Sequence, residues 1–199
     1  MVLRSARRIF WGRNMATALL VIDVQMAFVE RRAKGYVWGN PDAETSIAAL
    51  LKAFRSKGLP VVHVHHHDPN PGDSFHADQP GSAVQPCAAP RADEAVFIKH
   101  GSSGFIGTGL GDHLAAQGIT DLVVIGGAAN YCVESTTRMA GNLGYATTVV
   151  GDALINFRQI LRDGREVAAA DVLEMTLANL DGEFAQVASV DEVLARVAA

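Results

Sequence analysis

The chain has 199 residues, of which 49% are hydrophobic and 19% are charged, and these values suit a single globular domain with a sizeable core. Two cysteines are too few for a disulfide framework, which favours a reducing, cytoplasmic location. No apolar run reaches membrane-spanning length, and the net charge of −4 at pH 7 argues against nucleic acid as a partner.

The first 14 residues, Met1 to Asn14, differ in composition from the rest. They contain four arginines and no acidic residue, so the remaining chain carries 13 basic against 21 acidic residues. A targeting leader, a basic arm and an upstream start before Met15 all explain such a segment, although it lacks the apolar stretch of a secretory signal. We expect residues 1–14 to be a poorly ordered extension without a catalytic role and residues 15–199 to form the functional domain.

The first predicted strand, Ala18–Ile22, is entirely apolar and is followed directly by Asp23. A carboxylate is tolerated at the carboxyl end of a buried strand, where open α/β sheets bind their ligands, so Asp23 is a candidate acid or base. Capping of a turn or helix explains this residue equally well. Further on, Phe28, Tyr36 and Trp38 either line a pocket or pack in the core.

A helix is predicted next, with Asn40 as its N-cap and Pro41 as its first residue. Apolar residues spaced three or four apart continue to Phe54, and Gly58 ends the pattern. The strand that follows is Pro60–His67.

Histidines are concentrated in this strand. Alternation places His63, His65 and His67 on one face and His66 on the other. Two imidazoles on one face can share a metal ion, but the sequence shows no clean spacing for a third or fourth ligand. We therefore favour pocket lining or packing over a metal site, and we expect no cofactor.

Residues 68–93 are rich in Pro, Gly, Asp and Ala and predict a long surface connection, in which Cys87 has no activating neighbour. The apolar strand Ala95–Ile98 then ends at Lys99, and a turn of small residues follows. Taken alone, Lys99 is most simply a solvated lysine at a strand end.

Cys132 lies in the most strongly patterned stretch, residues 122–153. Leu122–Ile125 predicts a strand buried on both faces that ends at Gly126-Gly127, and helical spacing begins at Tyr131. The thiol is therefore expected at a helix N-terminus, where the helix dipole and unpaired N–H groups favour thiolate and can bind an oxyanion. The alternative is a small buried hydrophobic side chain.

The rest of the pattern alternates strands and helices: a strand from Ala146 to Val150, a long helix through Val167 and Leu177, a strand from Phe184 to Ala188, and a capping box at Ser189–Glu192 that opens the final helix. Such alternation predicts a single α/β domain with three layers, in which helices cover both faces of a central, mostly parallel sheet.

Three strand ends carry the residues with reactive chemistry. If the strands ending at Asp23, Lys99 and Gly127 are neighbours, then the side chains of Asp23, Lys99 and Cys132 converge on one crevice. An ammonium group stabilises a nearby thiolate, and a carboxylate beside both can shuttle a proton.

The chain resembles the isochorismatase-like cysteine hydrolases, a family with a Rossmann-like fold that includes nicotinamidases, N-carbamoylsarcosine amidase, and biuret and ureidoacrylate hydrolases. The resemblance runs from about Ala16 to the last helix, with its motifs in the family's order and spacing. The matching blocks are Asp23-Val24-Gln25 with Phe28, Lys99 with Ser103-Gly104-Phe105, Cys132 through Ala140, Gly144-Tyr145, Val149-Val150 and Asp152-Ala153.

This resemblance implies a catalytic triad in which Cys132 is the nucleophile, Asp23 accepts and donates protons, and Lys99 holds the thiolate as an ion pair. It also implies a cis peptide bond between Gly127 and Ala128 and an oxyanion hole formed by the N–H groups of Ala128 and Cys132. The implied activity is hydrolysis of a small amide, ureido or carbamoyl C–N bond through a thioester, by a homo-oligomer.

Two departures narrow the inference. Ala129 stands where the family often has Thr, and the metal-ligand positions of nicotinamidases correspond to His65, His67 and Ser74, which breaks that ligand set and disfavours a nicotinamidase. The expected substrate contacts are Phe28, Trp38, His65, His67, Phe105, Asn130 and Tyr131. Two rival functions are hydrolysis of an ether-type bond, as in isochorismatase, and non-catalytic binding of a small molecule.

Overall fold

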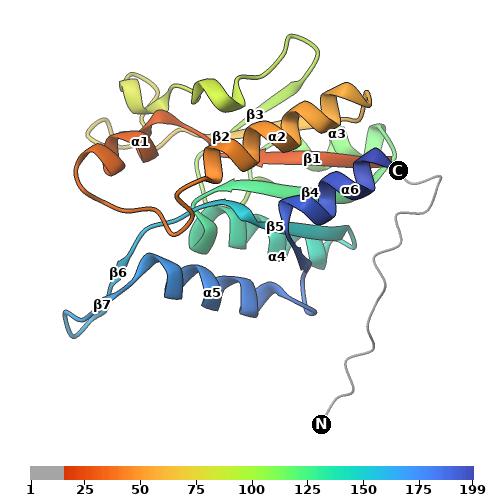
Figure 1. The fold of residues 1–199 in the computed structure, drawn as a ribbon. Helices are drawn as coiled ribbons and strands as arrows, with labels where there is room; N and C mark the ends of the chain where they lie inside the picture. The colour runs from red at the N-terminus through yellow and green to blue at the C-terminus, as the bar shows by residue number, and fades with distance from the viewer. Residues whose placement is uncertain (1–15) are drawn as a thin grey trace.

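The computed structural model describes residues 16–199, so the predicted extension lies outside the described residues. Six parallel strands form a central sheet in the order β3-β2-β1-β4-β5-β8 (Figure 1). The strands are β1 (Ala16–Ile22), β2 (Val61–His66), β3 (Ala95–Lys99), β4 (Ile119–Gly127), β5 (Ala146–Ile155) and β8 (Gln186–Ala188).

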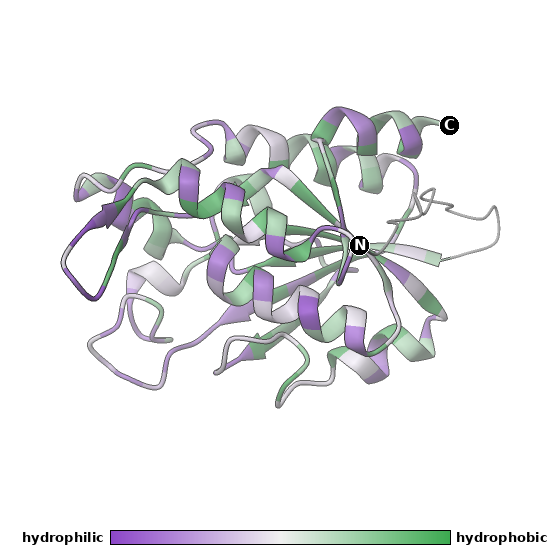
Figure 2. Cartoon of the chain, turned by 90° about the horizontal axis from the view of Figure 1, so that it is seen from below, coloured by the Kyte–Doolittle hydropathy of each residue, from purple (hydrophilic) through white to green (hydrophobic). Residues whose placement is uncertain are grey.

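Helices cover both faces of this sheet and divide the core into two clusters. On one face lie α1 (Met26–Ala33), α2 (Ala43–Ser56) and α6 (Val190–Ala198), and on the other lie α3 (Leu110–Ala116), α4 (Glu134–Asn142) and α5 (Ala169–Leu180). Figure 2 shows the apolar strands enclosed between helices whose outward residues are hydrophilic. Burial on both faces explains why β1 and β4 are almost continuously apolar, and the predicted three-layer α/β/α fold is confirmed.

The order of the strands creates a crevice. The chain winds from β1 outward through β2 to β3, and then returns to place β4 on the other side of β1. Ligand sites in open α/β sheets lie beside the carboxyl ends of the strands at such a reversal. The carboxyl ends of β1 and β4 therefore frame the expected site.

The predicted start of the last helix is confirmed, and the predicted start of α2 is not. The capping box is confirmed, since the Ser189 side chain accepts a hydrogen bond from the Glu192 N–H and the Glu192 side chain accepts one from the Ser189 N–H. The predicted helix start at Asn40 is wrong, because α2 begins at Ala43 after Asp42. The Asn40 amide instead donates hydrogen bonds to the carbonyls of Gly151 and Leu154 at 2.7 and 2.9 Å, and so ties this loop to β5.

The helix predicted through Val167 is also wrong over its first part. Residues Gln159–Ile160 (β6) and Glu166–Val167 (β7) form an antiparallel hairpin, and α5 starts only at Ala169. Gly164 makes the hairpin turn possible, because its φ of 83° lies in the left-handed region.

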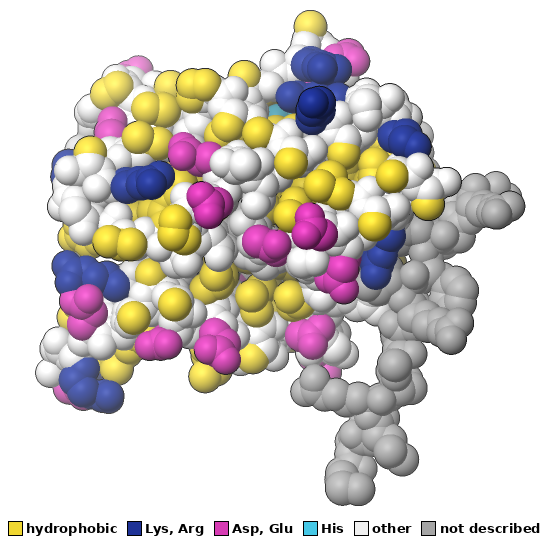
Figure 3. Space-filling model, viewed as in Figure 1, with side chains coloured by type: hydrophobic (Ala, Val, Ile, Leu, Met, Phe, Trp, Pro, Cys, Tyr) yellow, Lys and Arg dark blue, Asp and Glu magenta, His cyan; other side chains and the backbone are white. Residues whose placement is uncertain are grey.

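The surface over α5 and the first turn of α6 is acidic. Residues 169–192 include six acidic and no basic residues, and Figure 3 shows acidic side chains scattered among apolar ones on the face of the molecule that these helices form. Within residues 16–199, no helix has the length and apolarity needed to cross a bilayer.

Candidate active site

Asp23 directly follows β1 and is 1% exposed. Its φ of 49° is the only left-handed value at a non-glycine residue in the described chain, a conformation that aspartate adopts more readily than most residues. The backbone therefore leaves the direction of the strand here. The Asp23 carboxylate is turned toward Lys99, whose Nζ lies 2.7 Å from Oδ2.

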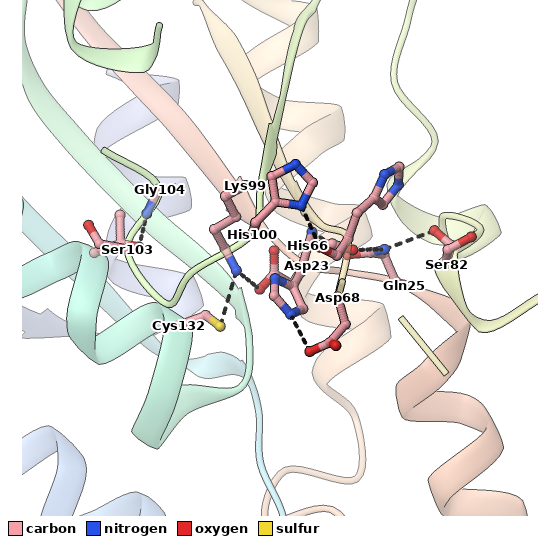
Figure 4. Close-up of polar contacts among 12 residues, drawn as sticks. Asp23, Gln25, His66, Asp68, Ser82, Lys99, His100, Ser103, Gly104 and Cys132 are labelled. Carbon is pink, nitrogen blue, oxygen red and sulfur yellow. Dashed lines mark hydrogen bonds and ion pairs between the residues drawn. The ribbon is translucent and has the colours of Figure 1, made fainter. Parts of the chain in front are cut away.

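Lys99 is the last residue of β3 and is fully buried. The strand arrangement differs from the simple expectation, because β1 pairs with β2 and β4, and β2 separates it from β3, the strand that ends at Lys99. The long lysine side chain compensates for this separation and reaches past the end of β2 into the crevice. There Nζ donates a hydrogen bond to the Cys132 sulfur at 3.2 Å, in addition to its ion pair with Asp23 (Figure 4).

Cys132 lies in a π-helical turn, Ala129–Val133, that follows β4 and leads directly into α4. The approach to this turn requires glycine: a Cβ at Gly126 would collide with the Ile22 carbonyl, and one at Gly127 would lie 2.6 Å from the Phe28 ring. The peptide bond between Gly127 and Ala128 is cis, the conformation that the resemblance implies.

The electrostatics of the resting site favour a neutral thiol. Burial raises the pKa of Cys132 to about 12, and the Asp23 carboxylate adds to this effect, while Lys99 acts in the opposite direction. Burial likewise raises the pKa of Asp23 above its ordinary value, against the lowering effect of Lys99. One ammonium group between two buried acidic groups compensates only one negative charge, so the site favours a single negative charge shared by Asp23 and Cys132.

Three of the aromatic residues predicted to contact substrate pack against other side chains. Phe28 and Trp38 are each 3% exposed, and both rings contact Phe157, at centroid distances of 5.9 and 6.5 Å. Phe105 stacks on Tyr145 at 5.7 Å. Phe28 nevertheless lies directly behind the Gly127 backbone, so it supports the turn that carries Cys132.

The remaining predicted contacts lie at different depths. Asn130 and Tyr131 share the turn with Cys132; the Asn130 Oδ1 atom is buried and has no hydrogen-bond partner, whereas the Tyr131 hydroxyl donates to Gln159 in β6 at 2.9 Å. His65 is 8% exposed, and burial, with smaller effects of His63 and His67, lowers its pKa to about 4. The backbone N–H of His67 donates to the Lys99 carbonyl at 2.9 Å.

The histidine cluster is divided among separate partners. His63 bonds to Glu94 at 2.9 Å on the α2 side of the sheet, while His66 lies 3.5 Å from Asp68. Across residues 16–199, no three or more His, Cys, Asp or Glu side chains are grouped so that they could hold a metal ion.

Two residues beside the triad carry no predicted role. His66 is the register partner of Lys99 across β2 and β3, and Gln25 bonds to the backbone of His66. His66 could have been identified from its position at the end of β2, the strand over which the Lys99 side chain must reach. Gln25 belongs to the motif Asp23-Val24-Gln25, but its hydrogen-bond partners lie in segments distant in sequence.

Known proteins match most of the length of this chain. The isochorismatase domain model matches residues 17–192. The chain belongs to the isochorismatase family. It is 34% identical over 180 residues to the uncharacterized isochorismatase family protein YrdC of Bacillus subtilis (strain 168), covering 89% of this chain and 94% of that protein.

Solved structures of the family have the same fold. An isochorismatase-family protein from Chromobacterium violaceum ATCC 12472 is 38% identical, with a TM-score of 0.87 and coverage of 95% of this chain and 96% of that one. N-carbamoylsarcosine amidase from Thermoplasma acidophilum is 28% identical, with a TM-score of 0.70 and coverage of 89% and 98%. The protein is therefore a hydrolase of the isochorismatase family.

Proposed function

We propose that this hydrolase cleaves the C–N bond of a small amide, ureido or carbamoyl compound, with Cys132 as nucleophile, Asp23 as acid and base, and Lys99 as the countercharge. The observation that carries the proposal is the continuous contact from the Asp23 carboxylate through Lys99 Nζ to the Cys132 sulfur, at 2.7 and 3.2 Å. Similarity to an amidase supports the choice of bond.

Activation of Cys132 follows from the electrostatics. Because burial and Asp23 favour the protonated thiol, attack on a carbonyl carbon requires a base, and Asp23 receives the proton as the C–S bond forms. The raised pKa of Asp23 makes this carboxylate a stronger base than an ordinary one. Lys99 then faces the negative charge that develops during attack, and the N–H groups of Ala128 and Cys132 bind the oxyanion.

The second half of the reaction returns each proton. Asp23 gives its proton to the departing nitrogen, ammonia or an amine leaves, and a thioester remains on Cys132. Water then attacks the thioester while Asp23 takes a proton from it. Release of the carboxylic or carbamic acid product, with return of the proton to sulfur, restores the neutral thiol.

The test is a panel of small amides, ureides and carbamoyl compounds assayed for ammonia release. At least one class is expected to turn over, and Cys132→Ala and Cys132→Ser are expected to abolish that turnover while the protein remains folded, because the nucleophile is lost. Turnover near the original rate in Cys132→Ala would instead remove the assignment of Cys132 as the nucleophile. Binding of panel compounds without any turnover would favour the non-catalytic binder.

A further inference from the structure

Gln25 follows Asp23 by two residues, and its side chain is fully buried. Its Oε1 accepts a hydrogen bond from the His66 N–H at 2.8 Å, and its Nε2 donates to the His66 carbonyl at 2.9 Å and to the Ser82 carbonyl at 2.8 Å (Figure 4). One side-chain amide therefore bonds both backbone groups of the last residue in β2 and a third group in the connection before β3.

This bonding pattern replaces a missing piece of β1. Regular pairing of β1 with β2 ends at Ile22 and Val64, and the Asp23 N–H makes one more bond to the Val64 carbonyl at 2.8 Å. The left-handed φ of Asp23 then turns the chain away, so β1 presents no further peptide group to His66. The Gln25 amide supplies the acceptor and the donor that the next peptide group would have supplied.

The opposite side of the same segment is held by residues 82–85, here called the strap. The Met26 N–H donates to the Ala83 carbonyl at 2.7 Å, and the Gln85 N–H donates to the Val24 carbonyl at 2.9 Å. The Gln85 side chain, also fully buried, donates to the Gln25 carbonyl at 2.9 Å. The chain just after Asp23 is thus fastened between the end of β2 and the strap.

We infer that Gln25 is a positioning residue for Asp23, because its side-chain amide holds the chain in the left-handed turn that aims the carboxylate at Lys99 and Cys132. The inference rests on the proposed function, in which Asp23 transfers the protons. Without the amide, His66 loses two backbone partners and the turn loses its link to β2. The Asp23 carboxylate is then no longer held in position to exchange a proton with the Cys132 thiol.

The test compares Gln25→Met with Gln85→Met, both in a Cys87→Ala background so that Cys132 is the only thiol. Methionine has a similar length to glutamine and adds no charge. The two glutamines are equally buried and belong to one network, but only the Gln25 side chain bonds β2. Gln25→Asn, whose shorter amide cannot reach both His66 and Ser82, serves if Gln25→Met does not fold.

Two readouts separate positioning from general weakening of the fold. The first is kcat and KM for ammonia release by the best compound of the panel, expressed per Cys132 titrated with iodoacetamide. The second is the rate of alkylation by iodoacetamide as a function of pH. Gln25→Met is expected to lower kcat per titrated thiol about 100-fold with little change in KM, and to move the alkylation profile to lower pH, because the carboxylate no longer opposes ionisation of the thiol.

Gln85→Met is expected to melt at a lower temperature while retaining kcat and the alkylation profile. The inference is overturned if Gln25→Met, or Gln25→Asn in its place, keeps both the kcat per titrated thiol and the alkylation profile of the parent protein. It is also overturned if Gln85→Met loses as much kcat per titrated thiol as the Gln25 variant. Asp23→Asn in the same assays separates failure of the inference about Gln25 from failure of the proposed function. If Asp23→Asn is inactive while the Gln25 variant is fully active, the inference alone fails; if Asp23→Asn is fully active, the proposed function fails with it.

Discussion

Asp23 acts on Cys132 in two opposite ways. In the resting site its carboxylate helps to raise the pKa of the thiol, and in the proposed reaction the same carboxylate removes the thiol proton. A base that suppresses premature ionisation keeps the sulfur unreactive until a substrate carbonyl is present. The resting protein is therefore expected to react slowly with thiol reagents at neutral pH, although Cys132 is partly exposed.

The first prediction concerns Asp23→Asn. The amide carries no negative charge, so Lys99 faces the thiol alone and the pKa of Cys132 falls. Alkylation by iodoacetamide at pH 7 is expected to become faster than in the unaltered protein, while ammonia release falls at least about 100-fold because the base is gone. Slower alkylation, or turnover that survives, would contradict the proposed roles.

A second prediction concerns Lys99→Met, which removes the countercharge. Without the ammonium group, burial and Asp23 act on Cys132 unopposed, so the pKa of the thiol rises further. Both alkylation at pH 7 and turnover are expected to decrease, the reverse of Asp23→Asn in the alkylation assay. Faster alkylation in Lys99→Met would show that the ion pair does not govern the sulfur.

Asp23, Lys99 and Cys132 could be predicted as candidates because each comes after a short apolar strand, and the family resemblance implied their roles in the proposed triad. The role of Gln25 and the position of His66 could not, since both depend on β2 lying between β1 and β3. Composition and spacing predict that strands exist, but they do not give the order of the strands in the sheet. The effect of burial, which raises the pKa of Cys132, could not be predicted either, because burial depends on the complete fold.

At the scale of elements, a partly buried ionic cluster joins α2, β2 and the segment before β3. Arg55 donates two hydrogen bonds to Glu94 at 2.7 and 2.8 Å, and His63 lies 2.9 Å from the same carboxylate. Burial opposes ionisation of Glu94, but the bonds from Arg55, from the Arg91 N–H and from His63 prevail and lower its pKa to about 2.

The third prediction follows from this cluster. Glu94→Gln leaves Arg55 without its countercharge and is expected to lower the free energy of unfolding by about 2 kcal/mol at pH 7. Since folding lowers the pKa of Glu94, its stabilising effect is complete above the ordinary value of 4.5 and is lost as the pH falls toward 2. Chemical denaturation should show the two proteins converging in that range, and a constant difference would contradict the assignment.

The β6–β7 hairpin shows why some elements escape prediction. Each strand has two residues, which is too short for alternation to be visible, and the apolar residues Ile160, Leu161 and Val167 continue into the pattern of α5. The alternation of longer strands and helices, in contrast, predicted the layers correctly, because burial of a parallel sheet on both faces leaves a strong sequence pattern.

At the scale of the whole molecule, large apolar side chains are exposed on the loop after α1 and on the hairpin. Val37 is 72% exposed and Ile160 is 59% exposed, and Tyr36 of the loop contacts Phe157, which precedes the hairpin, at a ring-centroid distance of 6.1 Å. Exposed apolar surface of this kind is typical of protein interfaces. We propose, as the family resemblance implied, that the protein is a homo-oligomer.

The fourth prediction tests this proposal by sedimentation. The full chain is expected to sediment as a multiple of 21.1 kDa, and Ile160→Glu is expected to shift it toward the monomer. Met175→Glu, at a side chain that is 63% exposed on α5, is the matched control and is expected to leave the assembly unchanged. A monomer in the unaltered protein would refute the proposal.

Covalent attachment of substrate to one sulfur is the most direct test of the account. The protein is mixed with the panel compound that turns over, quenched with acid during turnover, and measured by intact and peptide mass spectrometry. We predict a mass increase equal to the acyl part of the substrate on the peptide that contains Cys132, and no increase in Cys132→Ala. Hydrolysis by Cys132→Ala at the original rate, with no adduct in the unaltered protein, would contradict it.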